Sequence, residues 1–106
     1  MIEFFYFAGC PSYERALDEL HVAMDELAID RSQLTITEVV TDTDVERQDF
    51  PGSPTIRVNR RDVQDPGDLP RALTCRLYRH RDGRPSPLPD PQDLRDALND
   101  LIQNQR

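Results

Sequence analysis

The feature that most constrains the fold is a change in hydrophobic period between residues 7 and 13. Residues 2–7 (IEFFYF) are a run of mostly apolar β-formers that ends at Ala8-Gly9. From Pro11 onward, apolar residues recur at intervals of three and four, as in an amphipathic helix of about five turns. A near-continuous apolar strand followed by such a helix predicts a strand covered on both faces, joined by a crossover to a parallel neighbour.

The middle of the chain continues this alternation of strand and helix patterns. Residues 34–40 are rich in β-branched side chains and predict a second strand. Residues 41–44 offer N-cap side chains for a short helix that runs to about Gln48. After a Pro- and Gly-rich break, residues 55–59 predict a third strand. Residues 60–72 are polar and rich in turn-formers, so we expect a surface loop there.

The last third of the chain predicts one more strand and one more helix. Residues 74–80 are expected to form a fourth strand at the edge of the sheet. Asp90 and Pro91 are typical of a helix N-cap and first position, and they precede an apolar stripe at helical spacing. The predicted order is therefore βαβαββα. We expect the arginines around the fourth strand to be a solvated edge that discourages sheet-to-sheet aggregation: Arg76, Arg79, Arg81 and Arg84.

Length and charge limit the classes of function. The length of 106 residues suits one domain over residues 1–106. The sequence contains no run of eighteen apolar residues, so we expect no membrane span. The net charge of −7 makes this an acidic protein and argues against non-specific nucleic-acid binding. The first ten residues lack a basic segment and a cleavage-site pattern, so we expect a cytoplasmic protein and no membrane partner.

Cys10 is the candidate functional residue. Pro11 suits the first position of the helix, which would make Cys10 the N-cap. Free N–H groups at a helix N-terminus favour a thiolate, here those of Ser12 and Tyr13 with the Ser12 hydroxyl, although the acidic helix opposes it. A structural reading also stays open, because free cysteine is often simply a small buried residue.

The other candidate side chains have simpler explanations. We expect Cys75 to be structural, and a reducing compartment disfavours disulfides. At the start of an antiparallel fourth strand it would lie at the end of the sheet remote from Cys10. The Cα atoms would then exceed the limit of about 7 Å for a direct disulfide. Tyr13 is expected to be a helix-face residue rather than a catalytic acid, and His21 and His80 are too isolated for a zinc site.

Three of these observations together resemble the thioredoxin-like superfamily: the element order, Gly9-Cys10-Pro11-Ser12-Tyr13 after the first strand, and Ser53-Pro54-Thr55 opening the third. Cys10-Pro11-Ser12-Tyr13 is similar to the glutaredoxin C-P-x-C motif with its second cysteine replaced. The chain looks most like a group of small uncharacterised bacterial proteins with G-C-P near the N-terminus and a later C-R-x-Y. The resemblance covers the whole chain. It implies an α/β minimal thioredoxin fold, a mixed four-stranded sheet with helices on both faces.

The resemblance also implies a redox site. Cys10 would be the nucleophile of a monothiol site for thiol–disulfide exchange or reversible S-thiolation. The end of the first strand, at Cys10, would face a cis-proline loop at Pro54, and the Ser53 backbone would pair with an extended substrate passing over Cys10. Without a second cysteine in the motif, an external thiol must resolve the mixed disulfide, so the expected partner is a low-molecular-weight thiol or a protein disulfide. The residues expected to face substrate or support the thiolate are Pro11, Ser12, Tyr13, Ser53, Pro54 and Thr55.

Two other classes of function remain open. The chain could keep the fold as a non-catalytic binding module for partner recognition. A weaker hypothesis is soft-metal binding through Cys10 at a homodimer interface, because one thiolate is a poor site by itself. No cofactor motif is present in the sequence, so we expect no cofactor.

Overall fold

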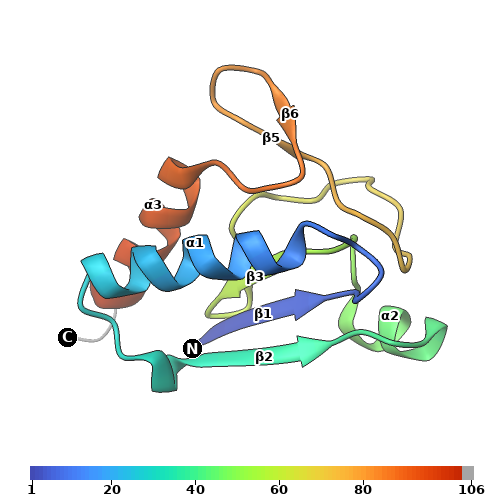
Figure 1. Ribbon diagram of the computed structural model, residues 1–106, viewed down its shortest axis with the longest axis horizontal. Helices are drawn as coiled ribbons and strands as arrows, with labels where there is room; N and C mark the ends of the chain where they lie inside the picture. The colour runs from blue at the N-terminus through green and yellow to red at the C-terminus, as the bar shows by residue number, and fades with distance from the viewer. Residues whose placement is uncertain (104–106) are drawn as a thin grey trace.

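A computed structural model describes residues 1–103, which form a four-stranded mixed sheet with three α-helices (Figure 1). The strands lie in the order β2 (Leu34–Glu38), β1 (Ile2–Tyr6), β3 (Thr55–Val58) and β4 (Arg61–Asp62). Strand β1 is central, parallel to β2 and antiparallel to β3. The expected α/β class and the parallel pairing of the first two strands are confirmed.

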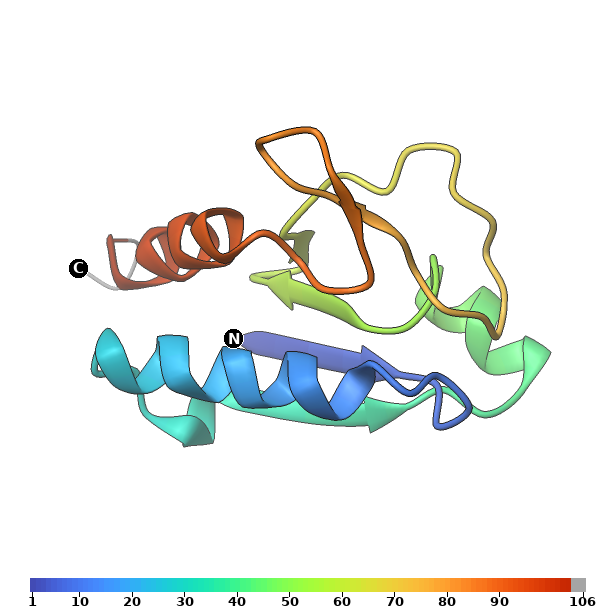
Figure 2. The same ribbon diagram turned by 45° about the horizontal axis from the view of Figure 1, so that its top comes forward.

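Three helices cover the two faces of this sheet. The apolar stripes of α1 (Tyr13–Glu26) and α3 (Pro91–Gln103) pack on the face that carries Phe4 and Ile56. The short helix α2 (Asp42–Gln48) packs Val45 against Phe5, which points to the opposite face because side chains alternate along a strand. Both views place α2 at the end of the sheet where β1 and β2 finish (Figures 1 and 2). No helix within residues 1–103 is long and apolar enough to span a bilayer.

The fourth strand of the sheet differs from the sequence prediction. Strand β3 is followed by Asn59 and Arg60, whose φ angles of 50° and 68° make a tight reversal. Such a turn returns the chain beside the strand that it leaves, so β4 takes the sheet edge next to β3. Residues 60–72, expected to be loop throughout, therefore contain this strand.

Residues 74–80 consequently do not join the four-stranded sheet. Only β5 (Tyr78–Arg79) is a strand there, and it pairs with β6 (Pro85–Ser86) in a separate two-stranded hairpin. This hairpin projects away from the main sheet in both views (Figures 1 and 2). The segment before the hairpin crosses the start of β3 instead, where Cys75 bridges Ser53, and this path decides the geometry of the candidate site. The expected edge strand at 74–80 is wrong.

Candidate functional site

Cys10 lies in the turn between β1 and α1 and is completely buried. Its backbone N–H donates to the Phe7 carbonyl at 3.0 Å, which closes the turn after the strand. The N-cap of α1 is Ser12, not Cys10, since the first helical bond runs from Ala16 N–H to the Ser12 carbonyl at 3.1 Å. Pro11 and Ser12 thus form a further turn before the helix, and the predicted N-cap position of Cys10 is wrong.

The turn before β3 supplies the second wall of the site. The Ser53–Pro54 peptide bond is cis, and both residues are buried. Because β3 runs antiparallel to β1, its beginning lies beside the end of β1. Cys10 Sγ is 3.5 Å from the Ser53 carbonyl oxygen, to which the thiol donates. Cys10 and Ser53, which are far apart in the sequence, therefore lie in contact, as the resemblance implies.

Cys75 lies against Cys10, contrary to the remote position that the sequence predicts. The two Sγ atoms are 2.7 Å apart, and both cysteines are free thiols. Residues 74–76 reach this place by running parallel to Ser53 across the start of β3. Ser53 N–H donates to the Thr74 carbonyl at 2.8 Å, and Arg76 N–H donates to the Ser53 carbonyl at 2.8 Å. The prediction that Cys75 lies remote from Cys10 is wrong, because this segment is not an antiparallel strand of the sheet.

The two thiols differ in exposure and in their part in the hydrogen bond. Cys10 is buried, whereas Cys75 is exposed. The Cys75 S–H donates to Cys10 Sγ, and this bond, together with partial burial, raises the pKa of Cys75 to about 11. Loss of this proton is therefore disfavoured, so the exposed Cys75 thiol stays protonated at neutral pH.

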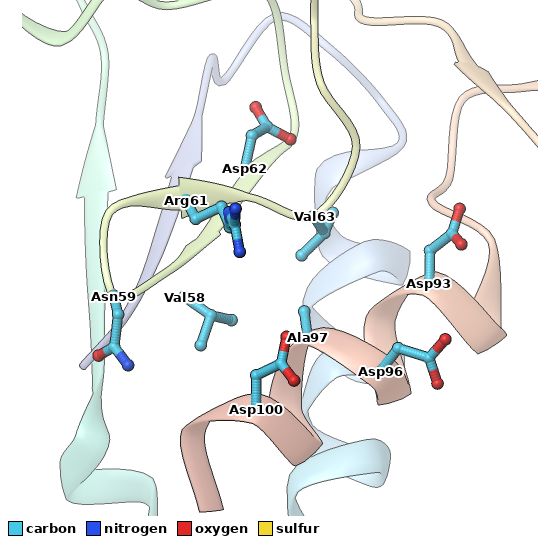
Figure 3. Close-up of a pocket in the computed structure, with 9 residues that line it drawn as sticks. All are labelled: Val58, Asn59, Arg61, Asp62, Val63, Asp93, Asp96, Ala97 and Asp100. Carbon is cyan, nitrogen blue, oxygen red and sulfur yellow. The ribbon is translucent and has the colours of Figure 1, made fainter. Parts of the chain in front are cut away.

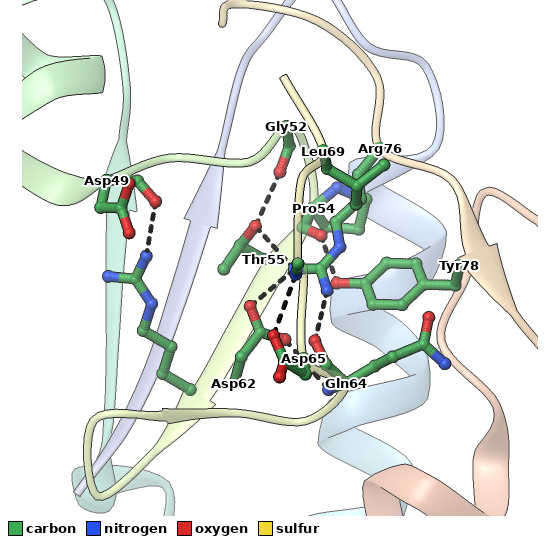
Figure 4. Close-up of polar contacts among 12 residues, drawn as sticks. Asp49, Gly52, Pro54, Thr55, Asp62, Gln64, Asp65, Leu69, Arg76 and Tyr78 are labelled. Atoms are coloured by element: carbon green, nitrogen blue, oxygen red, sulfur yellow. Dashed lines mark hydrogen bonds and ion pairs between the residues drawn. The ribbon is translucent and has the colours of Figure 1, made fainter. Parts of the chain in front are cut away.

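Arg76 fixes the position of the cysteine that precedes it. Its guanidinium is inaccessible to solvent and pairs with Asp62 of β4 at 2.7 Å. It also donates to the Gln64 carbonyl at 2.6 Å and to Thr55 Oγ1 at 3.3 Å (Figure 4). The guanidinium carbon lies 4.2 Å from the ring centroid of Tyr78, a cation–π contact. The expectation that Arg76 belongs to a solvated edge is wrong.

Two further side chains hold the segment on either side of Cys75. Leu73 packs against the apolar cluster that Phe5 forms with residues of α2 and its flanks. Tyr78 is buried, and its hydroxyl donates to the Pro54 carbonyl. Burial raises the pKa of Tyr78, so the phenol stays protonated and remains a donor. Residues 73–78 are therefore fixed at both ends, with the Cys75 side chain facing both Cys10 and solvent.

The remaining predicted site residues lie around this pair in different roles. Pro11 is exposed, and the Ser12 side chain makes no capping hydrogen bond. The ring of Tyr13 stacks on Tyr6 with centroids 4.4 Å apart, and partial burial and the Glu14 carboxylate raise its pKa. Among residues 1–103, the hydrogen-bonding partners of Cys10 Sγ are Ser53 and Cys75, not Ser12 or Tyr13. The Thr55 hydroxyl donates to the Gly52 carbonyl at 2.7 Å and accepts from the Arg76 guanidinium.

A cavity of about 580 Å³ lies at the other end of β3, between β4 and α3 (Figure 3). Three aspartates of α3 line it: Asp93, Asp96 and Asp100. The first two are ion-paired with Arg81 at 2.8 and 2.7 Å, so much of the negative charge there is neutralised. Within residues 1–103, no three His, Cys, Asp or Glu side chains gather in a way that could hold a metal ion. The pair of cysteines is therefore the arrangement with the clearest chemistry.

Comparisons with known proteins do not add to this description. Protein-family models, curated proteins and solved structures were compared with the chain, and none of the three comparisons gave a match. The function of the chain is therefore inferred from the contacts of Cys10, Cys75 and the residues that hold them.

The hydrogen bond between the thiols predicts a pH dependence. A raised pKa means that the reactive thiolate of Cys75 is depleted at every pH below that value. Cys10→Ala removes the largest cause of the shift, so we expect Cys75 to be alkylated faster in this variant than in the wild type at about pH 8. Rates of iodoacetamide labelling from neutral pH to about pH 11, read by peptide mass spectrometry, test this. Slower labelling in Cys10→Ala would contradict the assigned direction of the hydrogen bond.

Proposed function

We propose that the chain is a thioredoxin-like protein that carries out thiol–disulfide exchange, with Cys10 and Cys75 as its redox pair. The observation that carries this proposal is the 2.7 Å separation of the two sulfur atoms. A covalent S–S bond is about 2.05 Å long, so the two sulfur atoms are close enough for such a bond to form between them. This proposal extends the monothiol hypothesis. The motif has Tyr13 in place of its second cysteine, and Cys75, from outside the motif, supplies the second thiol instead.

The class is supported by the arrangement around the pair. Sheet order β2-β1-β3-β4 brings the turn after a central strand beside the cis Ser53–Pro54 bond, as the resemblance implies. The dithiol form would reduce a disulfide R–S–S–R to two thiols and become the Cys10–Cys75 disulfide, with two electrons and two protons passing to the substrate. An external thiol, which the expected cytoplasmic setting would supply, then restores the dithiol.

The proposal predicts a reversible intramolecular disulfide. The native protein is incubated with mixtures of reduced and oxidised glutathione in the presence of a metal chelator, quenched with acid and mapped by mass spectrometry. We expect a Cys10–Cys75 bond that forms as the buffer becomes more oxidising and disappears with dithiothreitol. The matched controls are Cys10→Ala and Cys75→Ser, which cannot form it. If the wild type keeps both thiols free, or makes only adducts, across the whole range, the proposal fails.

The second candidate function is a non-catalytic binding module. Complete burial of Cys10, together with the use of both backbone groups of Ser53 by the chain itself, favours this class. It predicts that the two cysteines do not exchange with glutathione in the folded state. The same redox titration therefore separates the two functions.

A further inference from the structure

We infer that Cys75 is the thiol that meets the substrate, that Cys10 is the resolving thiol, and that the substrate is a small disulfide rather than an extended peptide. This assignment rests on the proposed function and reverses the roles that the position of Cys10 beside a helix suggests. Two independent features carry it: the different exposure of the two thiols, and the occupation of the Ser53 backbone by residues 74–76.

Exposure decides which sulfur an incoming disulfide can reach. Exchange requires a thiolate to approach a sulfur atom directly, so a side chain closed to solvent cannot begin it. Cys10 is 0% exposed, whereas Cys75 is exposed at the surface. The exposed Cys75 sulfur lies 2.7 Å from the buried Cys10 sulfur. Entry at Cys75 requires no movement of the backbone.

The backbone of Ser53 decides the class of substrate. An extended peptide would bind by strand addition to free N–H and C=O groups at this turn. In this chain both groups are already bonded at 2.8 Å, to the Thr74 carbonyl and to the Arg76 N–H. Residues 74–76 thus occupy the place of a substrate strand, and Cys75 occupies the place of its cysteine. A peptide could bind there only by displacing a segment that Leu73, Arg76 and Tyr78 hold in place.

The exchange can be written with atoms and electrons balanced. Both cysteines begin as thiols, and Cys75 first gives its proton to solvent, which leaves a small fraction of Cys75 as the thiolate. Cys75 Sγ attacks R–S–S–R, forming Cys75–S–S–R and expelling R–S⁻. Cys10 then gives its proton to solvent or to that thiolate and attacks Cys75 Sγ. The Cys10–Cys75 disulfide forms and a second R–S⁻ leaves, so the substrate gains the two electrons that the pair loses.

Trapping experiments with oxidised glutathione test these roles. Cys10→Ala lacks the resolving thiol, and we expect it to accumulate one glutathione on Cys75. Cys75→Ser keeps the buried thiol, and we expect its glutathionylation to be at least about tenfold slower than that of Cys75 in Cys10→Ala. The wild type should pass to the intramolecular disulfide and release both glutathione molecules. Circular dichroism confirms folding, and Cys10→Ser replaces Cys10→Ala if the smaller side chain unfolds the chain.

The outcomes separate this inference from the proposed function. Equal or faster modification of Cys10 in Cys75→Ser would overturn the assigned roles while leaving redox function intact. Adducts on Cys75 of the wild type that never proceed to the Cys10–Cys75 bond would instead contradict the proposed function. An extended peptide carrying a glutathione mixed disulfide is the second probe. Exchange about tenfold faster than with oxidised glutathione at equal concentration would overturn the substrate class, since it would show that strand addition contributes.

Discussion

Arg76→Met is expected to lower the free energy of unfolding by about 3–5 kcal/mol, the cost of breaking a buried ion pair by removing one partner. The reason is that Asp62, whose side chain is only 10% exposed, loses the guanidinium with which it pairs. The Gln64 carbonyl and Thr55 Oγ1 also lose a donor. Denaturant unfolding followed by circular dichroism measures the change. The matched control is Arg84→Met, which removes an exposed pair with Asp82 and should cost at most about 1 kcal/mol.

The same variant has a second expected effect, on thiol accessibility. Arg76 follows Cys75 directly, and its contacts hold residues 74–76 against Ser53. Without the guanidinium this segment opens more often, so iodoacetamide should label the buried Cys10 faster than in the wild type. Arg76→Lys keeps the charge but not the planar fork, and it should give smaller changes in both measurements. If Arg76→Met unfolds at the wild-type denaturant concentration, Arg76 does not hold the segment by its ion pair.

The parts of the fold that depend on local pattern could be predicted from sequence. Strand β1, helix α1 and strand β2 follow from hydrophobic period and β-propensity, and their parallel pairing follows from the crossover connection. The fourth strand could not, because β4 is two residues long and carries no strand signal. Its position depends on the reversal at Asn59 and Arg60, where Arg60 is not a typical residue for a positive φ angle.

The candidate site could also be predicted only in part from the sequence. The meeting of Cys10 with Ser53 follows from the sheet topology, and the sequence predicted it. The place of Cys75 follows from an irregular segment, and no periodicity constrains such a path. One signal was present: Cys75, Arg76 and Tyr78 form the C-R-x-Y pattern, in which all three side chains contact the site. Residue type predicts that Arg76 is exposed, but its partner Asp62 lies in a segment for which the sequence predicts a loop.

Gly52→Ala is the second substitution with a large expected effect, because it acts directly on the contact between residues 74–76 and the cis-proline turn. Gly52 has a φ angle of +111°, a conformation that residues with a side chain rarely adopt. A Cβ atom there would lie 3.0 Å from Arg76 Cα and 3.1 Å from Arg76 N, which are backbone atoms that cannot rotate away. We therefore expect both a loss of stability and a displacement of Cys75 from Cys10.

Gly83→Ala is the matched control, since Gly83 also has a positive φ angle, +90°, but has no atom within 4 Å of an added Cβ. Backbone strain alone should cost about 1–3 kcal/mol there. Gly52→Ala should cost about 1–3 kcal/mol more because of the overpacking. Glutathione titration of the folded variants gives the second readout: the Cys10–Cys75 bond should require a more oxidising buffer in Gly52→Ala and the wild-type buffer in Gly83→Ala. Equal titrations in both variants would mean that close approach at Gly52 does not position the redox pair, leaving Arg76 and Tyr78 as the residues that do.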